Sequence, residues 1–298
     1  MRYFLPFFTV IIWSANTIVN KMSVSVIEPS AMSFFRWFFA MLILTPFCLP
    51  SIIKARHIIK PYLGKLALLA FLGMVLNQSL GYYAGLTTTA ANMSLISALI
   101  PLLCIFISQP LLGKKISWLS IIGALSSLVG LAFMLGKGDL LFIFQQPITI
   151  GDGLMIIASL SYATYCVLLK RWKMPLTNWQ LLYTQGVFSV VILSPLWLSS
   201  ETLSPALESL PLIAYAAVAA SILAPWMWFK AISLIGADSS AMFINLIPIM
   251  VLALASWFLG ENIYYYHIQG GIMVISGVML AQIKLPKKIQ LHSINTHI

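Results

Sequence analysis

The chain has 298 residues, of which 60% are hydrophobic and only 8% are charged. A soluble domain carries about 25% charged residues, so this composition excludes an ordinary water-soluble globule. The mean hydropathy of +0.97 indicates a polytopic membrane protein. The net charge is +10, but the 17 lysines and arginines are scattered through short loops between apolar runs. This scatter argues against a basic nucleic-acid-binding face, so the predicted surroundings are the lipid bilayer, without a nucleic-acid partner.

Apolar stretches follow one another along the chain, each long enough to cross about 30 Å of hydrocarbon. They are too long and too uniformly apolar for barrel strands, so the sequence predicts an all-α membrane protein with ten transmembrane helices. The first stretch follows Arg2 but lacks a small-x-small exit, which favours a retained helix over a signal peptide. The ten predicted helices cover residues 3–20, 31–49, 66–86, 92–112, 118–135, 151–169, 181–198, 212–229, 241–259 and 264–283.

Basic residues predict the orientation of these helices. With the N-terminus in the cytoplasm, 14 lysines and arginines lie on the cytoplasmic side and two, Lys21 and Lys137, lie outside. Because basic loops are retained in the cytoplasm, both termini are expected there, and nine or eleven helices would spoil the alternation. Residues 137–150 are then an external linker, and the basic residues 284–298 form a cytoplasmic tail near anionic lipid.

The chain contains an internal repeat. Residues 84–133 align without gaps on residues 231–280 at an offset of 147, with 11 identities in 50 positions. Each predicted half, residues 1–136 and residues 151–283, holds five helices, so the second half enters the membrane from the opposite side. The expected architecture is therefore two inverted five-helix repeats, which suits alternating access to a site between them. The identities include Pro101 with Pro248, Gly123 with Gly270, and Gly130 with Gly277.

Short motifs recur in a fixed order along the chain. They include Trp13-Ser14-Ala15-Asn16, Ser33-Phe34-Phe35-Arg36-Trp37, Tyr83-Ala84-Gly85-Leu86-Thr87, Ser161-Tyr162-Ala163 and Gly260-Glu261. By the order and spacing of these motifs the sequence resembles the drug/metabolite transporter superfamily, specifically ten-helix permeases with two EamA-type halves. Gly113-Lys114 stands where that family usually shows Gly-Glu, which we interpret as a cytoplasmic-loop substitution.

The resemblance implies an inner-membrane permease that moves a small metabolite, with amino acids among the candidates, by alternating access. Export is the direction that it implies. The alternatives are a metabolite importer and a membrane receptor or scaffold without flux. Oligomeric state and substrate are left open, and no enzymatic activity is expected, because no Ser, His and Asp set can be placed together.

Polar amides and deep aromatic side chains are the candidate lining of a substrate cavity. Buried amides are costly unless they are paired or wet, so they either join helices or face a polar path. Aromatic side chains in the spans either pack or stack on a substrate. The predicted cavity residues are Trp13, Asn16, Asn77, Tyr82, Ser97, Tyr162, Trp226 and Asn245.

Arg36 is the one charge well inside a predicted helix. It is expected to bond helix-end carbonyls or Glu28, with attraction of a substrate carboxylate as the alternative. Pro101, Pro225 and Pro248 are predicted to interrupt helices and to act as hinges.

No predicted helix carries a central Asp or Glu, which argues against proton exchange for a cationic drug and favours neutral or zwitterionic solutes. The three cysteines and four histidines lack the spacing of metal ligands, so neither a metal nor a cofactor is predicted.

Overall fold

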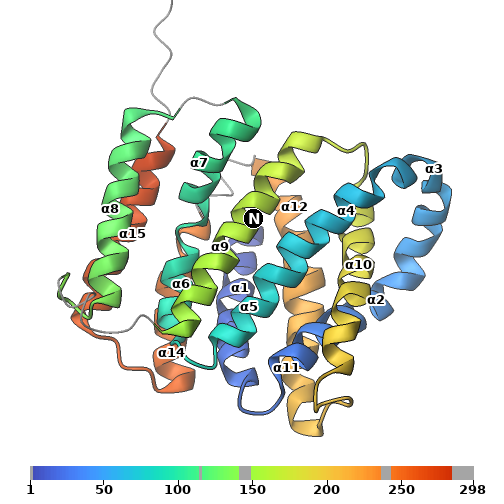
Figure 1. The fold of residues 1–298 in the computed structure, drawn as a ribbon, viewed down its shortest axis with the longest axis horizontal. Coiled ribbons are helices and arrows are strands. Elements are labelled where there is room, and N and C mark those ends of the chain that lie inside the picture. The colour runs from blue at the N-terminus through green and yellow to red at the C-terminus, as the bar shows by residue number, and fades with distance from the viewer. Residues whose placement is uncertain (1–2, 114–115, 141–148, 236–242, 284–298) are drawn as a thin grey trace, which may run out of the picture.

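The computed structural model describes residues 3–113, 116–140, 149–235 and 243–283. Within these ranges the chain is entirely helices and turns, which confirms the predicted all-α membrane fold (Figure 1). Lys114 and the predicted cytoplasmic tail, residues 284–298, lie outside the described residues, and the predicted linker is described only at its two ends.

Seven helical runs are long and apolar enough to cross a membrane. They are α2 (Pro29–Lys54); the run of α3 (Arg56–Ile59), η1 (Lys60–Tyr62), α4 (Leu63–Ala70), η2 (Phe71–Leu76) and α5 (Asn77–Ala84); α6 (Ala90–Ser97) with α7 (Ile100–Leu112); α8 (Trp118–Leu135); α9 (Ile150–Trp172); α10 (Asn178–Leu198); and the run of η4 (Leu207–Ser209), α11 (Leu210–Ala214), η5 (Tyr215–Leu223) and α12 (Ala224–Ile235). Three further helices are α1 (Phe4–Ser23), α14 (Ile247–Leu259) and α15 (Tyr265–Gln282). α1 and α15 lie along the first and tenth predicted spans, and α14 covers only the second part of the ninth.

Several helices extend past the apolar stretches that predicted them. α2 continues through Pro46 and Pro50 to Lys54, and the next run begins at Arg56 rather than near residue 66. Hydropathy locates the hydrocarbon layer, whereas helical hydrogen bonding continues into the polar layer beyond it. Basic residues such as Lys54 in a last turn also favour the negative end of the helix dipole.

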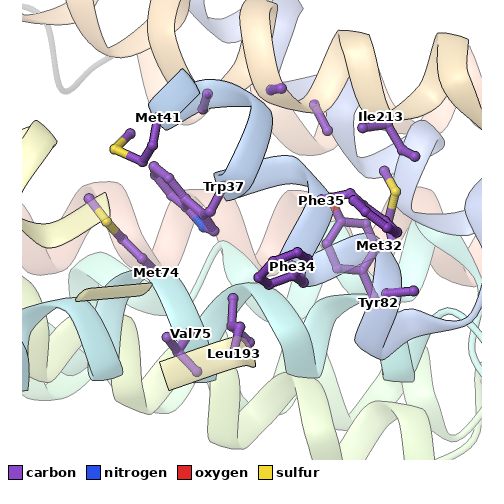
Figure 2. Close-up of a cluster of buried hydrophobic side chains, with 14 of the residues drawn as sticks. Met32, Phe34, Phe35, Trp37, Met41, Met74, Val75, Tyr82, Leu193 and Ile213 are labelled. Atoms are coloured by element: carbon purple, nitrogen blue, oxygen red, sulfur yellow. The ribbon is translucent and has the colours of Figure 1, made fainter. Parts of the chain in front are cut away.

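The first turns of α2 form the centre of the largest apolar cluster. Residues 29–37 are all buried, and α2 packs against α5, α10, α11 and η5. The rings of Phe34 and Trp197 stack with centroids 4.3 Å apart, and Trp37 donates from its indole nitrogen to Gln78 Oε1 at 2.9 Å. Figure 2 shows Phe34, Phe35 and Trp37 gathered in this cluster. α2 and α10 are thereby joined at one edge of the bundle (Figure 1).

At the other edge, α8 and α15 pack closely through glycines. A Cβ on Gly123 would lie 2.3 Å from the carbonyl oxygen of Gly277, and one on Gly270 would lie 2.7 Å from that of Gly130. Ser127 Oγ donates to the carbonyl of Val274 at 3.1 Å. Small residues let helix backbones approach each other in membranes, and here the approach joins the two helices by backbone contact. Figure 1 shows them side by side, running in opposite directions.

α1 lies between elements from distant parts of the chain. It packs against α5 and α6, and also against α12, α14 and η5. Tyr215 of η5 donates from its hydroxyl to the carbonyl of Ile12 at 2.9 Å. α9 has a matching set of neighbours, because it packs against α5, η2, α6 and α7. α1 and α9 are therefore the two helices best placed to present side chains to the middle of the bundle.

The three predicted hinge prolines are each the second residue of a helix. Pro101 and Pro248 are the second residues of α7 and α14, where the missing N–H has no intrahelical acceptor in any case. Ala98 and Leu99 form a turn between α6 and α7, so the fourth predicted span breaks just before Pro101. Pro225 is the second residue of α12, directly after the π-helical η5. Their role as hinges remains a prediction.

Candidate functional site

Two of the predicted cavity residues, Trp13 and Asn16, lie one turn apart on α1. Asn16 Nδ2 donates to Asn20 Oδ1 at 3.4 Å, and its buried Oδ1 has no partner in the part of the chain that the structure describes. A buried amide oxygen without a partner is costly, so this position calls for water or a polar solute. Trp13 packs against Trp228 of α12, with ring centroids 5.3 Å apart.

Tyr82 is fully buried and takes part in a buried polar contact with Arg36. Arg36 Nη1 donates to the Tyr82 hydroxyl at 3.1 Å, and Nε donates to Ser221 Oγ at 2.7 Å. Ser221 in turn donates to the carbonyl of Ala216, five residues earlier in the π-helical η5, at 2.8 Å. The expected partner Glu28 instead accepts from the hydroxyl of Ser30 and the backbone N–H of Glu201.

Arg36 therefore joins α2, α5 and η5 through neutral hydroxyls. That arrangement satisfies two of its five N–H groups and differs from the predicted contact with Glu28 or helix-end carbonyls. The prediction was wrong because hydropathy gives the depth of Arg36 but not which neighbouring helices present oxygen atoms there.

Asn77, Tyr162 and Ser97 lie around α9. Asn77 Nδ2 donates to the carbonyl of Ala158 at 3.0 Å, so it joins α5 to α9. The rings of Tyr162 and Tyr165 stack at 5.4 Å. Ser97 donates to the carbonyl of Met93 in its own helix. The amide and hydroxyl donors of Asn77 and Ser97 are thus engaged by the backbone.

Trp226 and Asn245 lie apart from these contacts. Trp226 is 43% exposed on α12, whereas its neighbour Trp228 makes the contact with Trp13. Asn245 is half-buried in the turn that precedes α14. The eight predicted residues are distributed over α1, α5, α6, α9, α12 and this turn, and α1 contacts three of the other four helices.

A cavity of about 710 Å³ lies at one end of the bundle, between the ends of α1 and α14 and the beginning of α11. None of the eight predicted residues lines it. Its wall is mainly apolar, and it carries one cation and two carboxylates on the face predicted to be external. The lining residues are Lys21, Met22, Val24, Ser25, Val26, Glu208, Pro211, Leu212, Phe258, Leu259 and Glu261.

Lys21 and Glu261, from this cavity wall, hold the two ends of the turn between α5 and α6. Lys21 Nζ donates to the carbonyls of Gly85 and Thr88, at 2.6 and 2.8 Å. Glu261 accepts from the backbone N–H groups of Ala90 and Ala91, at 2.8 and 3.2 Å. A cation at the end of one helix and a carboxylate at the start of the next both complement the helix dipoles.

The same turn is fixed from the side by the start of α9. Thr88 donates from its hydroxyl to Asp152, a buried residue that also completes the capping box with Thr149. Gly151 donates from its backbone N–H to Thr87 Oγ1 at 2.7 Å. A Cβ at Gly151 would lie 2.5 Å from the carbonyl oxygen of Ala84, so only glycine permits this approach. The turn is held by three separate parts of the chain.

The predicted cavity residues do not include Lys21 or Glu261. The sequence does mark both residues: Lys21 follows the first apolar stretch, and Glu261 belongs to the Gly260-Glu261 motif. In residues 3–113, 116–140, 149–235 and 243–283, no three His, Cys, Asp or Glu side chains group closely enough to hold a metal ion.

Comparison with known proteins gives a consistent answer. The model of the EamA-like transporter family matches residues 2–136 and 149–282. An uncharacterized transporter of Archaeoglobus fulgidus is 25% identical over 283 residues, covering 93% of this chain and 95% of that protein. The uncharacterized transporter YyaM of Bacillus subtilis is 27% identical over 217 residues, covering 69% and 70%. A solved crystal structure with 14% identity has the same fold, with a TM-score of 0.63 over 94% of this chain and 96% of that chain.

Proposed function

The chain belongs to the EamA-like transporter family, and from this premise we propose that it is an inner-membrane permease that exports a small metabolite by alternating access. The single observation that carries the proposal is that two successive segments, residues 2–136 and 149–282, match the same transporter family. The proposed architecture is ten transmembrane helices in two inverted halves, residues 1–136 and 151–283, with both termini in the cytoplasm. Residues 137–150 are the external linker and residues 284–298 the cytoplasmic tail.

Helix bounds support the duplication. α7 and α14 start and end at positions that correspond under the 147-residue offset, as do α8 and α15. α7 and α14 also end in the same way, at Gly113 and Gly260, each with φ +65°. Because only glycine adopts this left-handed conformation without strain, the two identical glycines have the same physical role.

Contacts between the proposed halves support an inverted arrangement. Under the offset, Gly123 corresponds to Gly270 and Gly130 to Gly277. The close approaches join Gly123 to Gly277 and Gly130 to Gly270, so exchanging the halves turns one contact into the other. A two-fold axis between α8 and α15 has this effect, and in the membrane plane it relates halves of opposite orientation.

We place the substrate path along α1, where the buried oxygen of Asn16 has no hydrogen-bond partner among the described residues. We assign Asn77 and Ser97 a structural role, because their side-chain donors already bond the backbone carbonyls of Ala158 and Met93. Neutral or zwitterionic solutes, amino acids among them, fit a path of this polarity, because its identified groups are amides, hydroxyls and aromatic rings. Export is proposed from the family resemblance alone, and import is the alternative direction.

The test is flux in proteoliposomes loaded and diluted with labelled amino acids, nucleosides or a cationic dye, with and without a proton gradient. We expect saturable counterflow of a neutral or zwitterionic solute. Gradient-dependent dye transport would overturn the argument from absent membrane carboxylates. Silence for every solute would exclude these three classes as substrates and would leave the substrate open.

Asn16→Ala tests the path itself. Losing one hydrogen bond to a solute costs about 0.5–1.5 kcal/mol, so the KM for the transported solute should rise by up to about tenfold at unchanged folded yield. Asn178→Ala, at an exposed asparagine that begins α10, is the matched control and should leave flux unaltered. Equal effects of the two substitutions would remove Asn16 from the path.

A further inference from the structure

The cavity between α1, α11 and α14 combines an apolar wall with a charged rim. α1 ends at Ser23, α11 begins at Leu210 and α14 ends at Leu259, so the cavity lies where three helices of a membrane protein reach the end of their apolar segments. Phe258 lines it while remaining 61% exposed, so the cavity is open along the side of the bundle. Lipid acyl chains and head groups meet at this level of a membrane protein.

The charged groups at the rim have hydrogen-bonding capacity to spare. Lys21 uses two of its three N–H groups on the carbonyls of Gly85 and Thr88. Each oxygen of Glu261 accepts one backbone N–H and has a second lone pair. For the carboxylate of Glu208, no partner is found among the described residues. The rim therefore offers one positively charged hydrogen-bond donor and several negatively charged hydrogen-bond acceptors.

We propose that this cavity binds a phosphatidylethanolamine molecule of the surrounding bilayer. The lipid phosphate accepts from Lys21, its ammonium group donates to Glu208 and Glu261, and its acyl chain follows the apolar wall formed by residues such as Leu212 and Phe258. Both polar contacts are charge-assisted hydrogen bonds, which are stronger than neutral ones. This site is independent of the solute that the protein transports.

Charge and donor chemistry select this head group among common phospholipids. The choline group of phosphatidylcholine has no N–H to donate to either carboxylate. Phosphatidylglycerol carries a net negative charge, which two carboxylates and one ammonium group repel. Phosphatidylethanolamine places an ammonium group and a phosphate close together, matching Glu208 and Lys21 in sign.

Occupancy of this site acts on the turn between α5 and α6. Lys21 and Glu261 hold the two ends of that turn, so a lipid that contacts both side chains restricts them in the positions that fix the turn. The bound lipid is therefore expected to stabilise the folded protein, because any ligand that binds only the folded state does so.

Binding is tested on the full-length protein, purified in detergent and stripped of lipid. Phosphatidylethanolamine, phosphatidylcholine and phosphatidylglycerol with the same acyl chains are added, and native mass spectrometry gives each dissociation constant. We expect phosphatidylethanolamine to bind the protein about tenfold more tightly than phosphatidylcholine, as a charge-assisted hydrogen bond implies. Glu208→Gln should reduce the preference, because it removes one of the two carboxylate charges that face the ammonium group and keeps the side-chain shape.

Glu201→Gln is the matched control, since Glu201 is an exposed acid of the same loop region that does not line the cavity. It should retain the full preference for phosphatidylethanolamine. The proposal is overturned if phosphatidylethanolamine binds no better than phosphatidylcholine, or if both variants lose the preference equally. It is also overturned if water-soluble glycerophosphoethanolamine binds as tightly as the lipid, because the site would then take a free zwitterion. Flux measurements on Glu208→Gln keep this result separate from the transport proposal.

Discussion

Gly123→Ala should destabilise the protein by separating α8 from α15. The added Cβ would lie 2.3 Å from the carbonyl oxygen of Gly277 and 2.6 Å from the backbone nitrogen of Ala281, whereas ordinary contact begins at 3.4 Å. Both obstructing atoms belong to the backbone, so no side-chain rotation relieves the overlap. The helices must then move apart by about 1 Å, and overpacking of this kind costs about 1–3 kcal/mol.

Alanine also has a better helix propensity than glycine, by about 1 kcal/mol, which opposes the steric cost. Gly153→Ala measures that gain alone, because a Cβ at Gly153 of α9 meets nothing within 4 Å. The difference between the two variants is therefore the packing cost, and about 2 kcal/mol corresponds to about 3 °C in melting temperature for a chain of 298 residues.

The assay is thermal unfolding in detergent, followed by the loss of the monodisperse peak in size-exclusion chromatography. Gly270→Ala should behave like Gly123→Ala, since its Cβ would lie 2.7 Å from the carbonyl oxygen of Gly130. Melting of Gly123→Ala at or above the temperature of Gly153→Ala would refute the conclusion that backbone contact joins these two helices.

Three further experiments probe the buried contacts. Glu261→Ala leaves two backbone N–H groups of α6 without their acceptor, and should lower stability by about 1–3 kcal/mol in thermal unfolding; an unchanged melting temperature would show that the turn does not depend on it. Arg36→Lys keeps the charge but removes the planar guanidinium that donates to both Tyr82 and Ser221. It should therefore lower the melting temperature nearly as much as Arg36→Met, and full stability of the lysine variant would show that charge alone matters. A double-mutant cycle of Trp13→Leu and Trp228→Leu should give a coupling energy of about 0.5–1.5 kcal/mol, and additive effects would exclude a direct ring contact.

Hydropathy and charge were sufficient to predict the fold class, because lipid imposes helices on any long apolar segment. Helix ends such as Lys54 and Arg56 were less predictable, since helical hydrogen bonds continue beyond the hydrocarbon layer. The glycine identities of the repeat carried no prediction of contact, and the structure shows that Gly123 and Gly277 lie where two helices approach closely.

Side-chain partners were the harder problem. Trp226 and Trp228 are two residues apart, so they point to opposite sides of α12, and hydropathy does not tell which side contacts α1. The partner of Arg36, Ser221, is 185 residues away, and a single sequence carries no signal for that proximity. Lys21 and Glu261 were assigned to outer ends of helices, but their common turn became visible only in three dimensions.

The contact between α8 and α15 also indicates how such a chain arose. Ser127 donates to the carbonyl of Val274, and the two residues are 147 positions apart, the offset of the repeat. Ser127 and Val274 are thus equivalent residues of the two halves. Under the proposed duplication, the ancestor was a homodimer in which this residue contacted the same residue of the other subunit, so each substitution altered both sides of the contact at once. Under the same proposal, gene fusion released that constraint and allowed serine at one position and valine at its counterpart. Such self-paired positions are where the earliest asymmetry between the two copies is expected.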